Sequence, residues 1–103
     1  MTPKVSIIIP VYKVEQYLSK SIQSCLNQTL REIEIVLVND GSPDGSKEII
    51  EHYANIDDRV KFIHKKNQGV TLARKDGLSM AVGDYIFYLD GDDYLTDNAI
   101  ELL

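Results

Sequence analysis

Three carboxylates stand within four positions near the end of the 103-residue chain, at Asp90, Asp92 and Asp93. Ionised carboxylates this close together repel one another unless a cation offsets their charge. Oxygen ligands of this kind suit Mn²⁺ or Mg²⁺, which proteins commonly hold through one or two carboxylates together with substrate phosphates. The alternative is a polar loop without a metal, which caps a helix that is expected to start near Thr96.

The carboxylates directly follow the apolar run 85–89, which is bounded by glycines. Such a run predicts a strand that is buried on both faces. Strands of that kind belong to parallel sheets, where ligands bind beyond the carboxyl ends of the strands. The carboxylates are therefore expected at the ligand-binding edge of a sheet.

The rest of the chain alternates between strand and helix patterns. Strands are expected over 5–9, 33–38 and 60–64, and helices over 15–27, 46–54 and 70–82. Pro10 should close the first strand, and Ser46 should cap the second helix. Gly83 should cap the end of the third helix, whose inward residues are expected to be Val70, Ala73, Gly77 and Ala81. A last helix is expected to run from near Thr96 to the end of the chain.

This succession predicts an α/β fold of three layers, α/β/α, with a mostly parallel, Rossmann-like sheet. The expected strand order is 3-2-1-4, which reverses between strands 1 and 4. A reversal of this kind opens a crevice at the carboxyl ends of the strands. Tyr12, Asp40 and the three carboxylates after strand 4 would border the crevice.

Three other residues have both a structural and a functional interpretation. Tyr12 either packs on the rim of the fold or stacks on a planar base. Asp40 precedes a glycine, and its carboxylate either forms a local turn or accepts the imide N–H of uracil. Arg74 either lies on a solvated helix face or points towards a diphosphate or the uracil carbonyls.

The composition excludes several classes of protein. A net charge of −5 argues against a nucleic-acid partner, which would require a basic surface. No apolar run approaches the roughly 20 residues of a membrane span. A single Cys25 forms no internal disulfide, so we expect a cytoplasmic location, with peripheral attachment to the inner face of a membrane left open.

Common phosphate-binding motifs are missing from the sequence. The first strand is followed by Pro-Val-Tyr-Lys, where a dinucleotide-binding protein has Gly-x-Gly-x-x-Gly, and no Gly-Lys-Ser/Thr loop occurs. Phosphates would therefore have to be held mainly through a metal, which agrees with the acidic cluster.

Four stretches of the chain form a combined pattern: Val5-Ser-Ile-Ile-Ile-Pro-Val-Tyr12, Ile35-Val-Leu-Val-Asn-Asp-Gly-Ser42 with Asp44, Asn67-Gln-Gly69 with Ala73-Arg74 and Gly77-Leu78, and Tyr88-Leu-Asp-Gly-Asp-Asp93. In this order, and over nearly the whole chain, they resemble family 2 glycosyltransferases of the GT-A fold. The chain departs from the family's usual residues at Lys13, Asn39 and Lys75.

The resemblance implies that residues 1–103 are the donor-binding N-terminal part of such a domain, with a UDP-sugar as the expected donor. Carried over by position, the donor-binding residues are Pro10, Val11, Tyr12, Asp40, Arg74, Asp90 and Asp92. The first three would line the nucleoside pocket, and Asp40 would contact the base. Arg74 would approach the uracil or the diphosphate, and Asp90 would lie near the ribose. Asp92 would bind Mn²⁺ or Mg²⁺, and Asp93 could share the metal.

The resemblance also implies a hexosyltransferase-like reaction, an inverting displacement that transfers the sugar to an unidentified carbohydrate or lipid-linked acceptor. The catalytic base and the acceptor-binding half are expected beyond residue 103, so residues 1–103 alone are expected to be inactive. Strand 4 would then lie at the edge of the sheet. We expect this edge to cause self-association, unless the residues belong to a longer chain that covers it.

Three alternative functions would require different sequence features. A nucleotidyltransferase should carry a glycine-rich basic loop after strand 1, which is missing here. A phosphatase that uses Asp90 as a nucleophile should carry its Asp-x-Asp motif after the first strand, with a small residue where Tyr94 stands. A non-catalytic nucleotide-binding module makes no such demand and remains an alternative.

Overall fold

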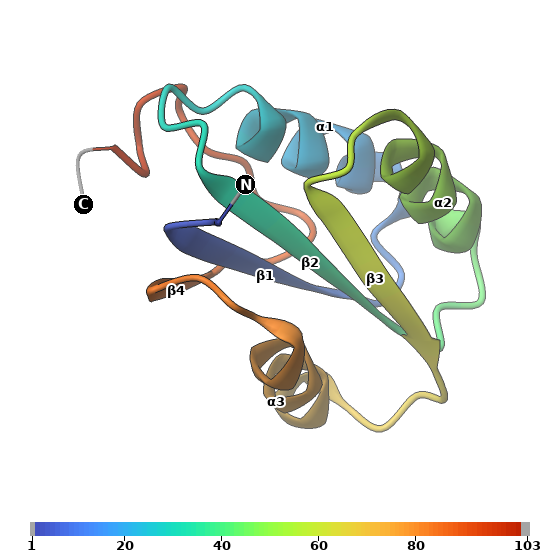
Figure 1. Ribbon diagram of the computed structural model, residues 1–103. Helices are drawn as coiled ribbons and strands as arrows, with labels where there is room; N and C mark the ends of the chain where they lie inside the picture. Colours follow the sequence, from blue (N-terminus) through green and yellow to red (C-terminus); the bar gives the residue numbers. More distant parts are fainter. Residues whose placement is uncertain (1, 102–103) are drawn as a thin grey trace.

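Four strands form one parallel sheet at the centre of the molecule (Figure 1). They are β1 (Val5–Val11), β2 (Ile33–Asp40), β3 (Val60–Lys65) and β4 (Tyr85–Tyr88), in the order β3-β2-β1-β4. The computed structural model describes residues 2–101. The predicted parallel α/β fold and its strand order are confirmed.

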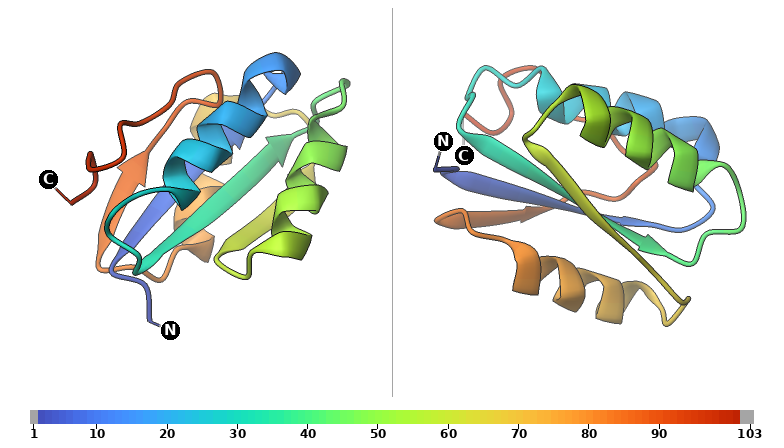
Figure 2. Two further views of the ribbon diagram at one scale, coloured as in Figure 1. Left: turned by 90° about the horizontal axis from the view of Figure 1, so that it is seen from above. Right: turned by 45° about the vertical axis from the view of Figure 1, so that its right-hand side comes forward.

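Helices cover both faces of the sheet, which gives three layers (Figure 2). Helices α1 (Glu15–Leu26) and α2 (Ser46–Ile56) lie on one face, and α3 (Val70–Met80) lies on the other. The larger core forms between the sheet and the first two helices, because α1 turns Leu18, Ile22 and Cys25 towards the strands. This spacing is that of an amphipathic helix.

Helix α3 lies very close to the sheet because it presents small residues. Its buried residues are Ala73 and Gly77. A Cβ atom at Gly77 would lie 2.4 Å from the Cγ2 atom of Ile8, so only glycine permits this approach. Two predicted inward residues, Ala73 and Gly77, are therefore confirmed, but Val70 is exposed at the start of the helix.

Pro10 lies within β1, so the expectation that it closes the strand was wrong. The strand continues to Val11, in register with Val38 and Asn39 of β2. The carbonyl of Ile8 faces β4, since it accepts the N–H of Leu89 at 3.0 Å. Pro10 lies two residues after Ile8, and its backbone faces the same side of β1, beyond the end of β4. Its missing N–H therefore costs no hydrogen bond.

Both expected helix caps were wrong. Ser46 is the first residue of α2, and its N–H donates to the carboxylate of Asp44 at 3.1 Å. Helix α3 ends at Met80. The N–H of Ala81 still donates to the carbonyl of Leu78 at 3.2 Å, but the two amides after it bond to side chains of the sheet. The N–H of Val82 donates to Glu34 at 2.6 Å, and the N–H of Gly83 donates to the Ser6 hydroxyl at 2.8 Å.

The helix expected from Thr96 onwards is also absent from the residues described, which form turns as far as Glu101. The last two residues of that prediction lie outside the described part of the chain. The carbonyl of Thr96 and the N–H of Ile100 both bond to the side chain of Gln28, which follows α1. Competition from this side chain explains the missing helix.

Strand β4 is more exposed than its apolar sequence predicts. Tyr85 is 63% exposed and Tyr88 is 43% exposed, because β4 is the edge strand and only β1 pairs with it. The expectation of burial on both faces was wrong, whereas the expected place at the edge is confirmed. Between residues 2 and 101, no helix has the length and apolar character needed to cross a membrane.

Candidate nucleotide-binding site

A cleft of about 370 Å³ lies at the carboxyl ends of β1, β2 and β4. Its lining residues are Pro10, Val11, Tyr12, Val14, Asp40, Asn67, Gly69, Val70, Asp90, Gly91 and Asp92. Six of the predicted donor-binding residues thus border one cleft, although they come from three strand ends. Arg74 and Asp93 lie beside the cleft without lining it. The parallel sheet brings these residues together because all its strands end at the same edge.

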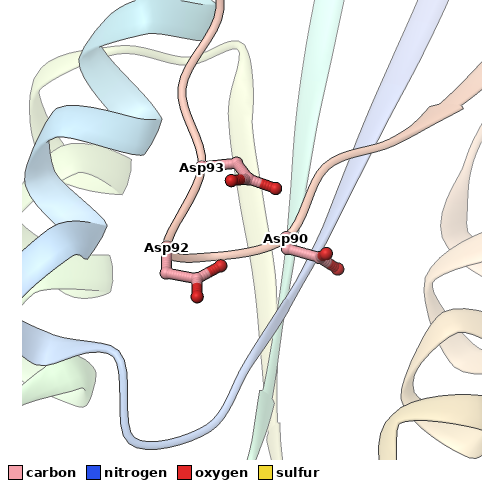
Figure 3. Close-up of side chains that lie close together, drawn as sticks. All are labelled: Asp90, Asp92 and Asp93. Atoms are coloured by element: carbon pink, nitrogen blue, oxygen red, sulfur yellow. The ribbon is translucent and has the colours of Figure 1, made fainter.

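The three carboxylates project from the loop that follows β4 (Figure 3). One oxygen from each of Asp90, Asp92 and Asp93 can be chosen so that all lie within 4.8 Å of one another, and all three residues are exposed. A backbone hydrogen bond of 3.0 Å from the N–H of Asp93 to the carbonyl of Asp90 closes the turn. The donor set, which is all carboxylate oxygen and open to solvent, fits a hard divalent cation.

Arg74 approaches this loop from α3, on the other face of the sheet. Its Nη2 atom donates to the Oδ1 atom of Asp90 at 3.2 Å, and its guanidinium lies 5.9 Å from the centre of the Tyr88 ring. The Nε–H of Arg74 is buried without a hydrogen-bond partner. The guanidinium therefore stands next to the carboxylates with donor capacity to spare.

Asp40 is only 3% exposed, and its carboxylate organises the loop between β3 and α3. Its Oδ1 atom accepts the N–H of Gln68 at 2.9 Å, and its Oδ2 atom accepts the N–H of Gly69 at 3.0 Å. The side-chain amide of Asn67 donates to Oδ2 as well, at 3.1 Å. The expectation that Asp40 bonds to neighbouring backbone groups was therefore wrong, because its partners lie 27 to 29 positions further along the chain. Oδ1 retains a free lone pair.

Asp44, to which the sequence assigned no role, joins the loops after β1 and β2. Its carboxylate accepts the Ser42 hydroxyl at 2.6 Å and the N–H of Glu15 at 3.2 Å. Partial burial raises the pKa of Asp44, but the hydrogen bonds from Ser42, Ser46 and Glu15 outweigh it and lower the pKa to about 2. Its position two residues before a helix start was the available sequence signal.

We expect Asp44→Ala to lower the free energy of unfolding at pH 7 by about 1–2 kcal/mol, the range for a lost helix-terminal hydrogen-bond acceptor. The folded pKa lies below the ordinary value of 3.8, so the stabilisation is complete above about pH 4. It is lost as the pH falls through 2. Urea denaturation of both proteins at pH 7 and at pH 2 checks this. A stability difference that is the same at both pH values would contradict it.

Comparison with known proteins adds independent information. The family model described as glycosyl transferase family 2 matches residues 6–103. The uncharacterized glycosyltransferase EpsJ of Bacillus subtilis is 50% identical over 103 residues, which are all of this chain and 30% of EpsJ.

Two solved structures share the fold of this chain. TarS of S. aureus in complex with UDP-GlcNAc has a TM-score of 0.88 and 30% identity, over 95% of this chain and 29% of that one. GalNAc-T7 with UDP, GalNAc and Mn²⁺ has a TM-score of 0.82 and 26% identity, over 93% of this chain and 19% of that one. The chain thus spans less than a third of EpsJ and of each of these two proteins.

Proposed function

Because this chain belongs to glycosyl transferase family 2 and has a GT-A fold, we propose that its cleft binds the UDP-sugar donor of a glycosyltransferase. The observation that carries the proposal is the composition of the cleft. The lining combines the apolar residues Pro10, Val11 and Tyr12 with the carboxylates Asp90 and Asp92. A nucleoside diphosphate likewise combines a planar base with phosphates, which a metal held by carboxylates can bind. UDP-GlcNAc bound to TarS supports this choice of donor.

In the proposed complex, different residues contact the base, the ribose and the diphosphate. Tyr12 stacks on the uracil, and Asp40 accepts its imide N–H through the free lone pair of Oδ1. Asp90 lies near the ribose, and Arg74 donates to the diphosphate or to the uracil carbonyls. Both residues are already adjacent, 3.2 Å apart through Nη2 and Oδ1.

Asp92, with Asp93 beside it, would hold Mn²⁺ or Mg²⁺. The three exposed carboxylates fit such an ion, and GalNAc-T7, which shares the fold, was solved with Mn²⁺. When bound, the ion supplies positive charge for the diphosphate, a Lewis-acid contribution of several kcal/mol in comparable enzymes. Asp92, which lines the cleft, would place that charge at its border.

The reaction we propose is an inverting displacement that transfers the sugar to a carbohydrate or lipid-linked acceptor. The acceptor oxygen forms a bond to the anomeric carbon while the bond to the diphosphate breaks, and a base takes the hydroxyl proton. Asp40 is unsuitable as that base, because it is buried and bonded to the loop 67–69. We therefore propose that residues 1–103 alone bind the donor but transfer no sugar.

A thermal-shift panel tests the proposed donor. UDP with Mn²⁺ should raise the melting temperature of the protein, whereas ADP and GDP with Mn²⁺ should raise it much less. Omitting Mn²⁺ and adding EDTA should remove most of the UDP effect. A protein that UDP does not stabilise, or that all three nucleotides stabilise equally, would refute a UDP-specific cleft.

We further propose that the protein is cytoplasmic and that the exposed edge of β4 pairs with another copy of this chain when residues 1–103 are isolated. The unpaired backbone of β4 and its exposed apolar side chains support the second proposal. Light scattering at increasing protein concentration should give a mass that rises above 11.6 kDa. A constant mass of one chain would contradict pairing through this edge.

A further inference from the structure

The segment 90–101 lacks regular secondary structure but follows a defined course alongside α1 (Figures 1 and 2). This segment contains the carboxylates of the candidate site. Its backbone polar groups must find partners, because unpaired buried groups are costly. Several of those partners are the side chains of Ser21 and Ser24 on α1 and of Gln28 just beyond its end, which we call the polar stripe.

Ser21 is the residue of the polar stripe that contacts the loop 90–93, which we call the acidic loop. Its side chain is fully buried, and its hydroxyl lies 2.6 Å from the carbonyl oxygen of Asp93 and 3.4 Å from that of Asp90. The hydroxyl proton goes to Asp93, the nearer acceptor. One buried serine thus contacts both ends of the turn that carries the carboxylates.

The other two residues continue the same pattern along the segment. The Ser24 hydroxyl accepts the N–H of Leu95 at 3.0 Å. Gln28 is 1% exposed, and its Nε2 atom donates to the carbonyl of Thr96 at 2.6 Å. The Oε1 atom of Gln28 accepts the N–H of Ile100 at 2.9 Å. A spacing of three residues places Ser21 and Ser24 on one face of α1, and Gln28 follows two residues after the helix ends at Leu26.

We propose that the polar stripe positions the acidic loop for its ligand, with Ser21 as the principal positioning residue. Helix α1 packs on the sheet through Leu18 and Ile22, so Ser21 and Ser24 fix the loop relative to the ends of the strands. The loop itself has no such anchor in its own backbone beyond the bond from Asp93 to Asp90. The consequence for donor binding depends on the proposed function.

Loss of the Ser21 hydroxyl should loosen the loop without altering any carboxylate. Partners that orient metal ligands typically contribute 10- to 100-fold to metal affinity. In Ser21→Ala, UDP affinity in Mn²⁺ should therefore fall about tenfold, while UDP affinity in EDTA stays unchanged. A role in stability alone would lower the melting temperature without this selective effect.

Ser6→Ala provides the matched control. Ser6 is also fully buried and also hydrogen-bonded, to Glu34 at 2.5 Å and to the N–H of Gly83 at 2.8 Å. It lies towards the other end of β1, away from the cleft. This variant should lower the melting temperature but leave UDP affinity unchanged in both Mn²⁺ and EDTA.

Amide hydrogen exchange on the ligand-free protein tests the positioning role independently of function. Ser21→Ala should speed exchange at Asp93 and Leu95 at least tenfold, and Ser6→Ala should not. If Ser21→Ala does not fold, Ser24→Ala serves instead, because its hydroxyl directly accepts the N–H of Leu95.

The outcomes separate the two claims. Unchanged exchange at Asp93 and Leu95 would overturn the positioning role, as would an equal loss of UDP affinity in Mn²⁺ and EDTA. Faster exchange in a protein whose wild type binds no UDP would support the positioning of the loop and refute the proposed function.

Discussion

Asp92→Asn is expected to weaken UDP binding in Mn²⁺ by about 100-fold and to leave UDP binding in EDTA almost unchanged. The substitution keeps the size of the side chain but removes the charge from one of three clustered carboxylates. A neutral amide oxygen is a weaker ligand for a divalent ion than a carboxylate oxygen. Calorimetric titration of UDP in each buffer measures both affinities.

Asp84→Asn is the control for this experiment. Asp84 is an exposed aspartate just before β4, at the opposite end of that strand from the acidic loop. It makes the same change in net charge, so any general electrostatic effect on UDP would appear there too. Equal affinities of the wild type in Mn²⁺ and EDTA would show that no metal site contributes to nucleotide binding.

Asp40→Ala is expected to have an effect of similar size, a cost of about 1.5–3 kcal/mol in UDP binding, the range for a hydrogen bond to a charged group. This cost corresponds to a loss of affinity of about 10- to 150-fold. The structure adds a second reason for a loss, since Gln68 and Gly69 would lose their acceptor. Gly69 lines the cleft, so a displaced loop would also alter its wall.

A comparison of nucleotides separates the two roles of Asp40. ADP has no imide N–H, so it should bind the wild type poorly if Asp40 reads the base. Calorimetry with UDP and ADP on both proteins measures this selectivity. Comparable affinities of the wild type for UDP and ADP would leave Asp40 as a residue that only holds the loop 67–69.

The parallel sheet was predictable because continuous apolar runs alternate with amphipathic helices. The ends of the elements were less predictable, since they depend on contacts that are distant in sequence. Pro10 continues β1 because β4 has ended beside it. Helix α3 ends early because Glu34 and Ser6 accept the amides of Val82 and Gly83. Local propensity contains no information about such partners.

The grouping of the candidate site residues followed from the topology, but their contacts did not. Asp40 was expected to face a local turn or a base, whereas its observed partners lie in the loop before α3. The role of Gln28 was also missed. A polar residue just after a helix looks like ordinary solvent exposure, but the segment 90–101 covers Gln28.

Mapping of UDP by nuclear magnetic resonance tests the central claim most directly. Titration of UDP with Mg²⁺ into isotopically labelled protein should shift the amides of Val11, Tyr12, Asp40 and Gly69, and Mn²⁺ should broaden those of Asp92 and Asp93. Amides at the opposite edge, such as those of Val5 and Ile33, should not change. Shifts confined to that opposite edge, or no shifts at all, would contradict a nucleotide-sugar site in this cleft.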